Sequence, residues 1–83
     1  MRCVMKGAQR VLAEIRTVLE MKPAESYASL MSYLGVCEDL AEIHRKLVDY
    51  QADGIEDEEK LLYLENEVHR CREFLVKNGY VSL

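Results

Sequence analysis

Hydrophobic residues recur along three stretches of this chain at alternating intervals of three and four positions. An α-helix turns once in about 3.6 residues, so this spacing gathers such residues on one side of a helix. The three sets are Val4, Ala8, Val11, Ile15 and Val18; Tyr33, Val36, Leu40, Ile43, Leu47 and Tyr50; and Leu61, Leu64, Val68, Cys71 and Leu75. The pattern predicts an all-α fold, built as an antiparallel three-helix bundle or as an extended helical hairpin.

Turn-forming residues set the expected limits of the helices, which are about residues 3–21, 24–52 and 56–78. Pro23 should end the first helix and suits the first turn of the second, where its missing N–H group costs nothing. Gly54 should end the second helix and Gly79 the third, because glycine readily adopts the left-handed conformation that terminates helices. After Gly79, Tyr80 or Val81 can fold back over the last turn.

The second helix carries another apolar stripe beside the first, formed by Tyr27, Leu30, Cys37, Ala41, His44 and Val48. Together the two stripes cover an arc of about 220°, which is too wide for contact with one neighbouring helix. Gly35 could break this helix, but the stripe from Tyr33 to Leu40 crosses Gly35 in phase and favours a continuous helix. We therefore expect a homodimer. The seam of that dimer, or else the core of one chain, is formed by Tyr33, Val36, Leu40, Ile43, Leu47 and Tyr50.

The composition is that of one small globular domain spanning residues 1–83. Apolar residues make up 49% of the chain, but it has no Trp and a single Phe, so its core should be thin. No stretch reaches the roughly 20 apolar residues needed to cross a membrane, so we expect no membrane association. The three cysteines, Cys3, Cys37 and Cys71, are too few and too scattered for a disulfide framework, which indicates a cytoplasmic location.

Charge is unevenly distributed along the chain. Residues 1–24 are net basic and residues 25–69 strongly acidic, within an overall net charge of −4. In an antiparallel hairpin the basic start lies beside the acidic turn, so pairing within the chain explains this polarity. The main alternative is a nucleic-acid-associated regulator, because Arg2, Lys6 and Arg10 form a row that could contact phosphates. The overall acidity opposes that reading, and we expect no bound nucleic acid.

A metal-binding helical bundle is a weaker alternative. Cys37 and His44 lie seven positions apart and so share one side of the second helix, and Cys71 on the third helix could approach them. The spacing matches no common zinc motif, and cysteine is often buried without any chemical role. We therefore expect neither a metal nor another cofactor.

The remaining hypothesis is a protein–protein interaction module. No glycine-rich loop follows a strand and no nucleophile stands beside either histidine in the sequence, so we expect no enzyme activity. A small adaptor, inhibitor or regulatory subunit would act through its helix faces on another protein. The candidate contact residues are Leu62, His69 and Val76, which form a row outside the core stripe of the third helix, and the acidic residues Glu38, Asp39 and Glu42.

Overall fold

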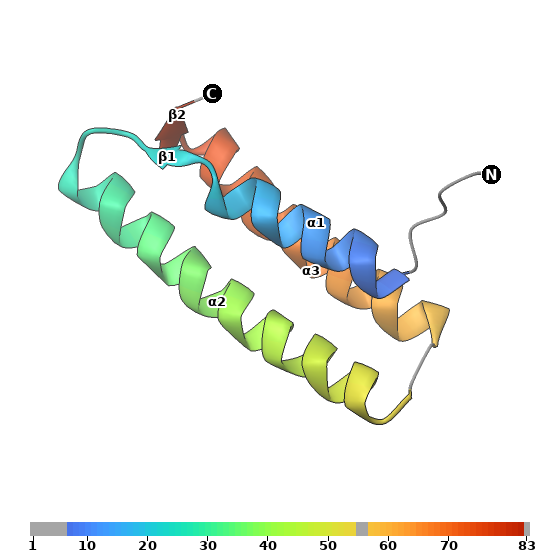
Figure 1. The fold of residues 1–83 in the computed structure, drawn as a ribbon. Helices are drawn as coiled ribbons and strands as arrows, with labels where there is room; N and C mark the ends of the chain where they lie inside the picture. The colour runs from blue at the N-terminus through green and yellow to red at the C-terminus, as the bar shows by residue number, and fades with distance from the viewer. Residues whose placement is uncertain (1–6, 55–56, 83) are drawn as a thin grey trace.

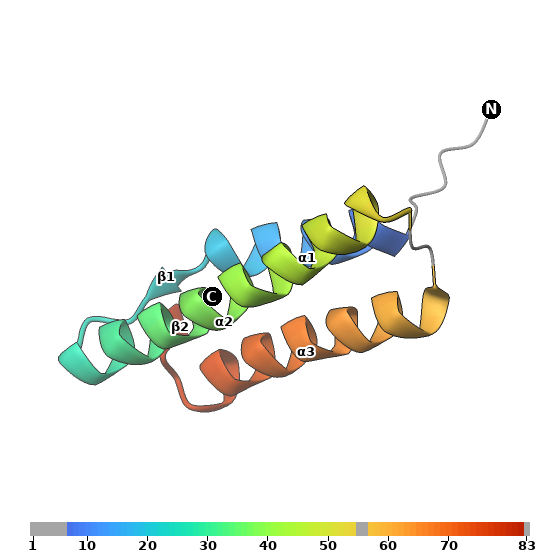
Figure 2. The ribbon, with the colours of Figure 1, turned by 90° about the horizontal axis from the view of Figure 1, so that it is seen from below.

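A computed structural model describes residues 7–54 and 57–82 of the chain. Its elements are α1 (Gly7–Leu19), β1 (Lys22–Pro23), α2 (Tyr27–Ala52), α3 (Glu58–Lys77) and β2 (Val81–Ser82). Consecutive helices run in opposite directions, with α3 behind α1 in one view and α2 alongside both helices in the perpendicular view (Figures 1 and 2). The predicted all-α fold is confirmed, and it is the three-helix bundle rather than an extended hairpin.

The core forms where the three apolar stripes meet. Its buried members are Val11, Ile15, Val18, Val36, Leu40, Ile43, Leu47, Leu61, Leu64, Val68, Leu75 and Val81. Tyr33, Tyr50 and Cys71 pack against the edge of this cluster. Val4 of the predicted first stripe lies outside the described residues. Helix α2 is continuous through Gly35, as the unbroken phase of its apolar stripe predicts.

The connection between α1 and α2 differs from the prediction. Pro23 does not enter the second helix but lies in β1, opposite Val81 of β2. Helix α2 begins later, at Tyr27, because the Ser26 side chain accepts a hydrogen bond of 3.0 Å from the Ser29 backbone N–H. A serine at this position satisfies a donor that the first turn of a helix leaves unpaired.

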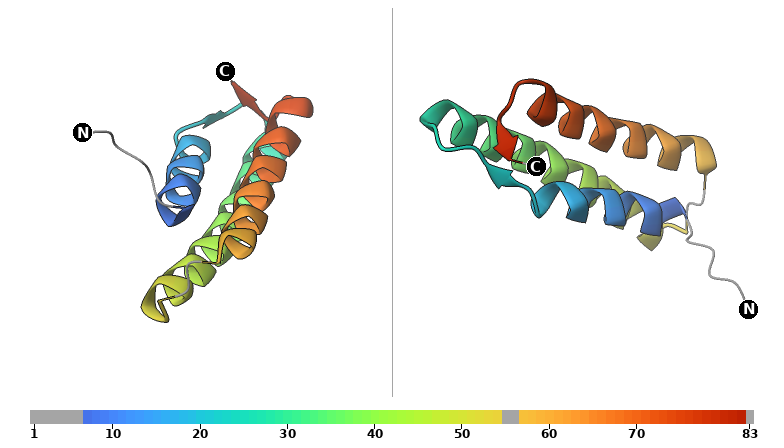
Figure 3. Two further views of the ribbon diagram at one scale, coloured as in Figure 1. Left: turned by 90° about the vertical axis from the view of Figure 1, so that its right-hand side faces the viewer. Right: turned by 90° about the horizontal axis from the view of Figure 1, so that it is seen from above.

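The short pair of strands was not expected from the sequence. β1 and β2 are antiparallel, and the Ala24 N–H donates a hydrogen bond of 2.8 Å to the Tyr80 carbonyl just beyond the pair. In Figure 3, β2 lies at the end of α3 and meets β1 there. Two-residue strands leave almost no periodic signal, and Pro23 is compatible with the edge position because it has no N–H to pair.

The last helix begins and ends close to the predicted positions. Asp57 caps α3 by accepting hydrogen bonds from the N–H groups of Glu59 and Lys60. At the other end Gly79 has a φ of 69°, and the Tyr80 N–H donates to the Leu75 carbonyl at 2.9 Å. This is the glycine-terminated helix end that the sequence predicts. It turns the chain so that Val81 is buried in the core.

Within the described part of the chain, none of the helices has the length and hydrophobicity required to span a membrane.

Candidate interaction surface

The seam between α1 and α3 is closed by charged pairs within the chain. The Arg10 guanidinium lies 2.5 Å from a Glu58 carboxylate oxygen and 3.5 Å from one of Glu65. One turn further along, His69 Nε2 lies 3.2 Å from a carboxylate oxygen of Glu14. The hydrogen bond and the negative charge of Glu58 raise the pKa of Arg10 above its ordinary value.

These pairs bear on the basic row considered for phosphate binding. Arg10 is engaged with two carboxylates, which is the internal charge pairing that the sequence suggests for the basic start and the acidic turn. Arg2 and Lys6 lie outside the described residues. The described member of the row is therefore committed to contacts within the chain and offers no support for the nucleic-acid alternative.

The structure does not assemble the metal-ligand set suggested by the sequence. Cys37 and His44 line a groove between α1 and α2, whereas Cys71 lines a separate groove between α2 and α3. Among the described residues, the cluster with ligand atoms all within 4.8 Å of one another is Glu14, Glu65 and His69. Sequence analysis missed this cluster because it joins two helices, although Glu65 and His69 are spaced for one helix face.

The ionisable side chains of Glu14, Glu65 and His69 already contact one another or Arg10. His69 pairs with Glu14, and the positive charge of Arg10 lies beside Glu65. All three side chains are partly open to solvent. These contacts make the cluster part of the charged seam between α1 and α3, and they explain why its three side chains lie close together.

The row of Leu62, His69 and Val76 lies along the flank of α3 next to this seam. Leu62 and Val76 are exposed, as the sequence predicts. His69 between them pairs with Glu14 of α1 and lines a shallow groove together with Val76 and the charged residues Arg72, Glu73 and Lys77. Charged groups therefore interrupt the row, and it does not form a continuous apolar surface.

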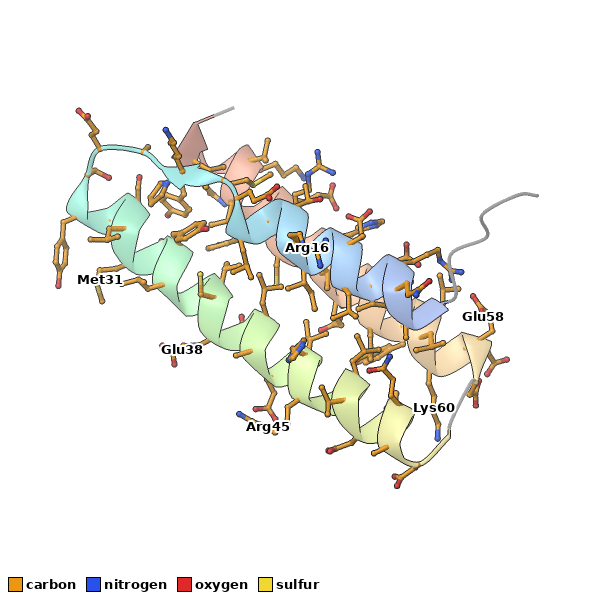
Figure 4. The ribbon with its side chains drawn as sticks, in the orientation of Figure 1. Arg16, Met31, Glu38, Arg45, Glu58 and Lys60 are labelled. Atoms are coloured by element: carbon orange, nitrogen blue, oxygen red, sulfur yellow. The ribbon has the colours of Figure 1, made fainter. Side chains whose placement is uncertain are left out.

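The three acidic candidates on α2 do not share one surface. Glu42 is exposed and pairs with Arg45, and Glu38 is exposed on the outer edge of the same helix. Figure 4 shows Glu38 and Arg45 on the edge of α2 that points away from α1. Asp39 instead lines the groove between α2 and α3 with Cys71. Only Glu38 and Glu42 are thus available together.

The apolar set proposed as a dimer seam or a core is used inside a single chain. Val36, Leu40, Ile43 and Leu47 are buried, and Tyr33 and Tyr50 pack against them. In this structure these six residues hold α2 against α1 and α3. Four of the six are buried and the two tyrosines are half-buried, so they offer little surface for a further contact of α2.

The second apolar stripe of α2 is exposed at Leu30, Ala41 and Val48, on the side of the helix next to α1, and Leu34 lies in the same row. Leu34, Ala41 and Val48 recur every seven residues and are all exposed, with Leu30 on the same side. Leu19 of α1 is exposed beside them. We call Leu19, Leu30, Leu34, Ala41 and Val48 the α1–α2 face.

A shallow groove of about 400 Å³ runs through the α1–α2 face. It is lined by Ile15, Leu19, Cys37, Leu40, Ala41 and His44. Its lining is mainly apolar, whereas the groove between α2 and α3 contains Asp39, Glu67 and Arg70. Burial raises the pKa of the Cys37 thiol, so at neutral pH it adds a neutral, weakly polar group to the α1–α2 face.

The α1–α2 face could be predicted from the sequence only in part. The width of the apolar arc on the second helix indicated that α2 has more apolar side chains than one neighbour can cover. Leu34 and Leu19 were missed as contact candidates. Leu34 could have been found from its seven-residue spacing to Ala41 and Val48. Leu19 is placed on the face only by the packing of α1 against α2.

No protein-family model, curated protein or solved structure matches the chain.

Proposed function

We propose that this protein is a non-enzymatic protein–protein interaction module that binds its partner through the α1–α2 face. The observation that carries the proposal is the row of exposed apolar side chains at Leu30, Leu34, Ala41 and Val48, next to the exposed Leu19. Single exposed apolar residues are common on soluble proteins, but a contiguous row on two adjacent helices is typical of a contact surface.

Electrostatics favour this face over the other candidate surfaces. The α1–α3 seam is filled by Arg10 with Glu58 and Glu65, and by His69 with Glu14. The α2–α3 groove contains Asp39, Glu67 and Arg70. Removing such groups from water is costly, whereas covering Leu34 and Val48 is favourable at about 25 cal/mol for each Å² of apolar surface.

The proposal includes the small adaptor, inhibitor or regulatory subunit expected from the sequence, in a cytoplasmic setting where Cys37 and Cys71 stay reduced. A helix face of this kind fits a partner that contributes helices of its own, because apolar residues every seven positions match the ridges of a facing helix.

Affinity capture with two matched variants tests the proposal. Leu34 and Leu62 are 46% and 48% exposed on the surfaces of different helices, so Leu34→Asp and Leu62→Asp should disturb the isolated fold equally little. Circular dichroism verifies that both fold. Quantitative mass spectrometry should find proteins that the wild type and Leu62→Asp capture and that Leu34→Asp does not. An untagged copy of the chain counts among these proteins. Identical sets for all three baits, or loss with Leu62→Asp alone, would contradict the proposal.

A further inference from the structure

We propose that the occupant of the α1–α2 face is a second copy of this chain, with the two α2 helices antiparallel about a two-fold axis near Ala41. The inference rests on the proposed function, since it names the partner of the same face. It follows from the order of apolar and charged residues along the exposed side of α2.

The exposed residues Leu34 and Val48 are placed symmetrically about Ala41 on α2. Leu34 stands seven residues before it and Val48 seven residues after it, and all three are exposed on one side of the helix. In an antiparallel pair centred on Ala41, Leu34 of one copy therefore meets Val48 of the other. Alanine at the centre has a small side chain, which lets the two helix backbones approach closely.

The charges beside this row are complementary in the same register. Glu38 and Arg45 stand three residues before and four residues after Ala41, and both lie on the edge of α2 that faces away from α1 (Figure 4). A two-fold axis perpendicular to two antiparallel helices keeps that edge on the same side in both copies. Glu38 of each copy then lies beside Arg45 of the other, so the interface contains two such pairs.

Arg45 can make this contact without losing the one it has. Its guanidinium already pairs with Glu42 of the same helix, and both groups are well exposed. A guanidinium has five N–H donors, so Arg45 can hold Glu42 and a carboxylate of the other copy together. In a parallel pair the two-fold axis runs along the helices and places this edge on opposite sides of the contact in the two copies, so the pairs of Glu38 with Arg45 would not form.

Helix α1 completes the arrangement. Ile15 and Leu19 line the same groove as Ala41, so α1 lies beside the centre of the proposed contact. The same two-fold axis brings α1 of each copy onto the same side of the paired α2 helices. The two α1 helices and the two α2 helices would then enclose a four-helix core, with α3 on the outside of each copy.

Charge reversal measured by sedimentation equilibrium tests the register. Glu38→Arg and Arg45→Glu each put two like-charge pairs into the symmetric dimer, and each should raise the dimer Kd about tenfold. An equimolar mixture of the two variants restores both opposite-charge pairs, and its Kd should return to within about threefold of the wild-type value. Glu73→Arg and Arg72→Glu on α3 carry the same charge changes away from the face and should leave Kd unchanged.

The outcomes separate this inference from the proposed function. Mixing rescues association without any chain carrying both changes, so a folding defect in a double variant cannot obscure the result. If neither charge reversal changes the dimer Kd, or if mixing the two variants does not restore it, the proposed register is wrong. A single 9.6 kDa species at high micromolar concentration would contradict the inference that a second copy occupies the α1–α2 face. If Leu34→Asp then still abolishes capture of a different protein, the proposed function stands with another occupant.

Discussion

The hydroxyl of Tyr33 on α2 donates a hydrogen bond of 2.8 Å to the Leu19 carbonyl at the end of α1, and the Val18 carbonyl lies 3.3 Å from the same hydroxyl. The last carbonyl groups of a helix have no partner within the helix, so Tyr33 satisfies a group that would otherwise need water. The contact also fixes the end of α1 against α2 at Leu19, one of the residues of the α1–α2 face.

Removing this hydroxyl should destabilise the fold. Tyr33→Phe keeps the ring against the core but loses the bond to Leu19, and we expect the free energy of unfolding to fall by about 1 kcal/mol. Urea unfolding followed by circular dichroism measures the change. Tyr27→Phe is the matched control, because Tyr27 is 79% exposed, and it should leave the unfolding free energy unchanged. Equal effects of the two variants would show that the Tyr33 hydroxyl has no structural role.

Buried and exposed leucines of α2 should respond differently to the same truncation. Leu40 is almost fully buried, so Leu40→Ala should lower the unfolding free energy by about 2–4 kcal/mol through lost burial and the cavity left behind. Leu34→Ala, at an exposed position, should change it by less than about 0.5 kcal/mol in dilute protein. Urea titrations below the association range compare them. Similar losses at both positions would mean that Leu34 is buried within a single chain.

The charged seam between α1 and α3 should contribute in a salt-dependent manner. Arg10→Gln removes the guanidinium that faces Glu58 and Glu65, and it should lower Tm at low ionic strength. Because salt screens exposed charges, the difference from the wild type should shrink as sodium chloride is raised toward 1 M. Arg16→Gln, on an exposed position of the same helix, serves as the control. A difference that stays constant with salt would mean that Arg10 acts through packing.

The thiol of Cys71 should be a poor nucleophile in the folded chain. Burial raises its pKa, and the nearby negative charges of Asp39 and Glu67 raise it further. Alkylation at pH 8 should therefore be slower at Cys71 in the folded chain than in urea, with the rate increasing at higher pH. Mass spectrometry of the alkylated peptides measures both rates. Asp39→Asn should bring the thiol pKa down, and a rate unaffected by unfolding would refute the assignment.

The same shift has a consequence for stability. The folded chain holds the Cys71 proton more tightly than the unfolded chain, because the pKa is raised on folding. Its contribution to stability is therefore complete below the ordinary thiol pKa and is lost as the pH rises through the folded value. A Cys71→Ser variant should lose less stability than the wild type between neutral and alkaline pH in urea titrations, and an identical loss would contradict this.

The helices and the core were predictable because each depends on periodicity that the sequence displays directly. Leu40, Leu64 and Leu75 follow the helical repeat, and all three are buried. The start of α2 was placed three residues too early because Ser26 as a cap outweighed Pro23 as a first-turn residue. The pairing of Pro23 with Val81 joins residues almost sixty positions apart, and no local pattern encodes it.

For the candidate surfaces too, features that follow from helical periodicity were predictable and features that depend on the packing of two helices were not. Exposure of Leu62 and Val76 followed from their position on the helix, but the pairing of His69 with Glu14 required the packing of α1 on α3. The sequence predicted an excess of apolar surface on the second helix, and the structure shows which part stays uncovered. The sequence alone could not show that the packing of α1 would bring Leu19 beside these residues.

The most direct measurement of the central claim is alkylation of Cys37 and Cys71 in one sample over a range of protein concentrations. Cys37 lines the groove of the α1–α2 face, whereas Cys71 lines the groove between α2 and α3 and serves as an internal reference. If a second copy covers the face, the rate at Cys37 falls as concentration rises while the rate at Cys71 stays constant. If the rate at Cys37 is independent of concentration, or if Cys71 alone becomes protected, the α1–α2 face is not where two copies meet.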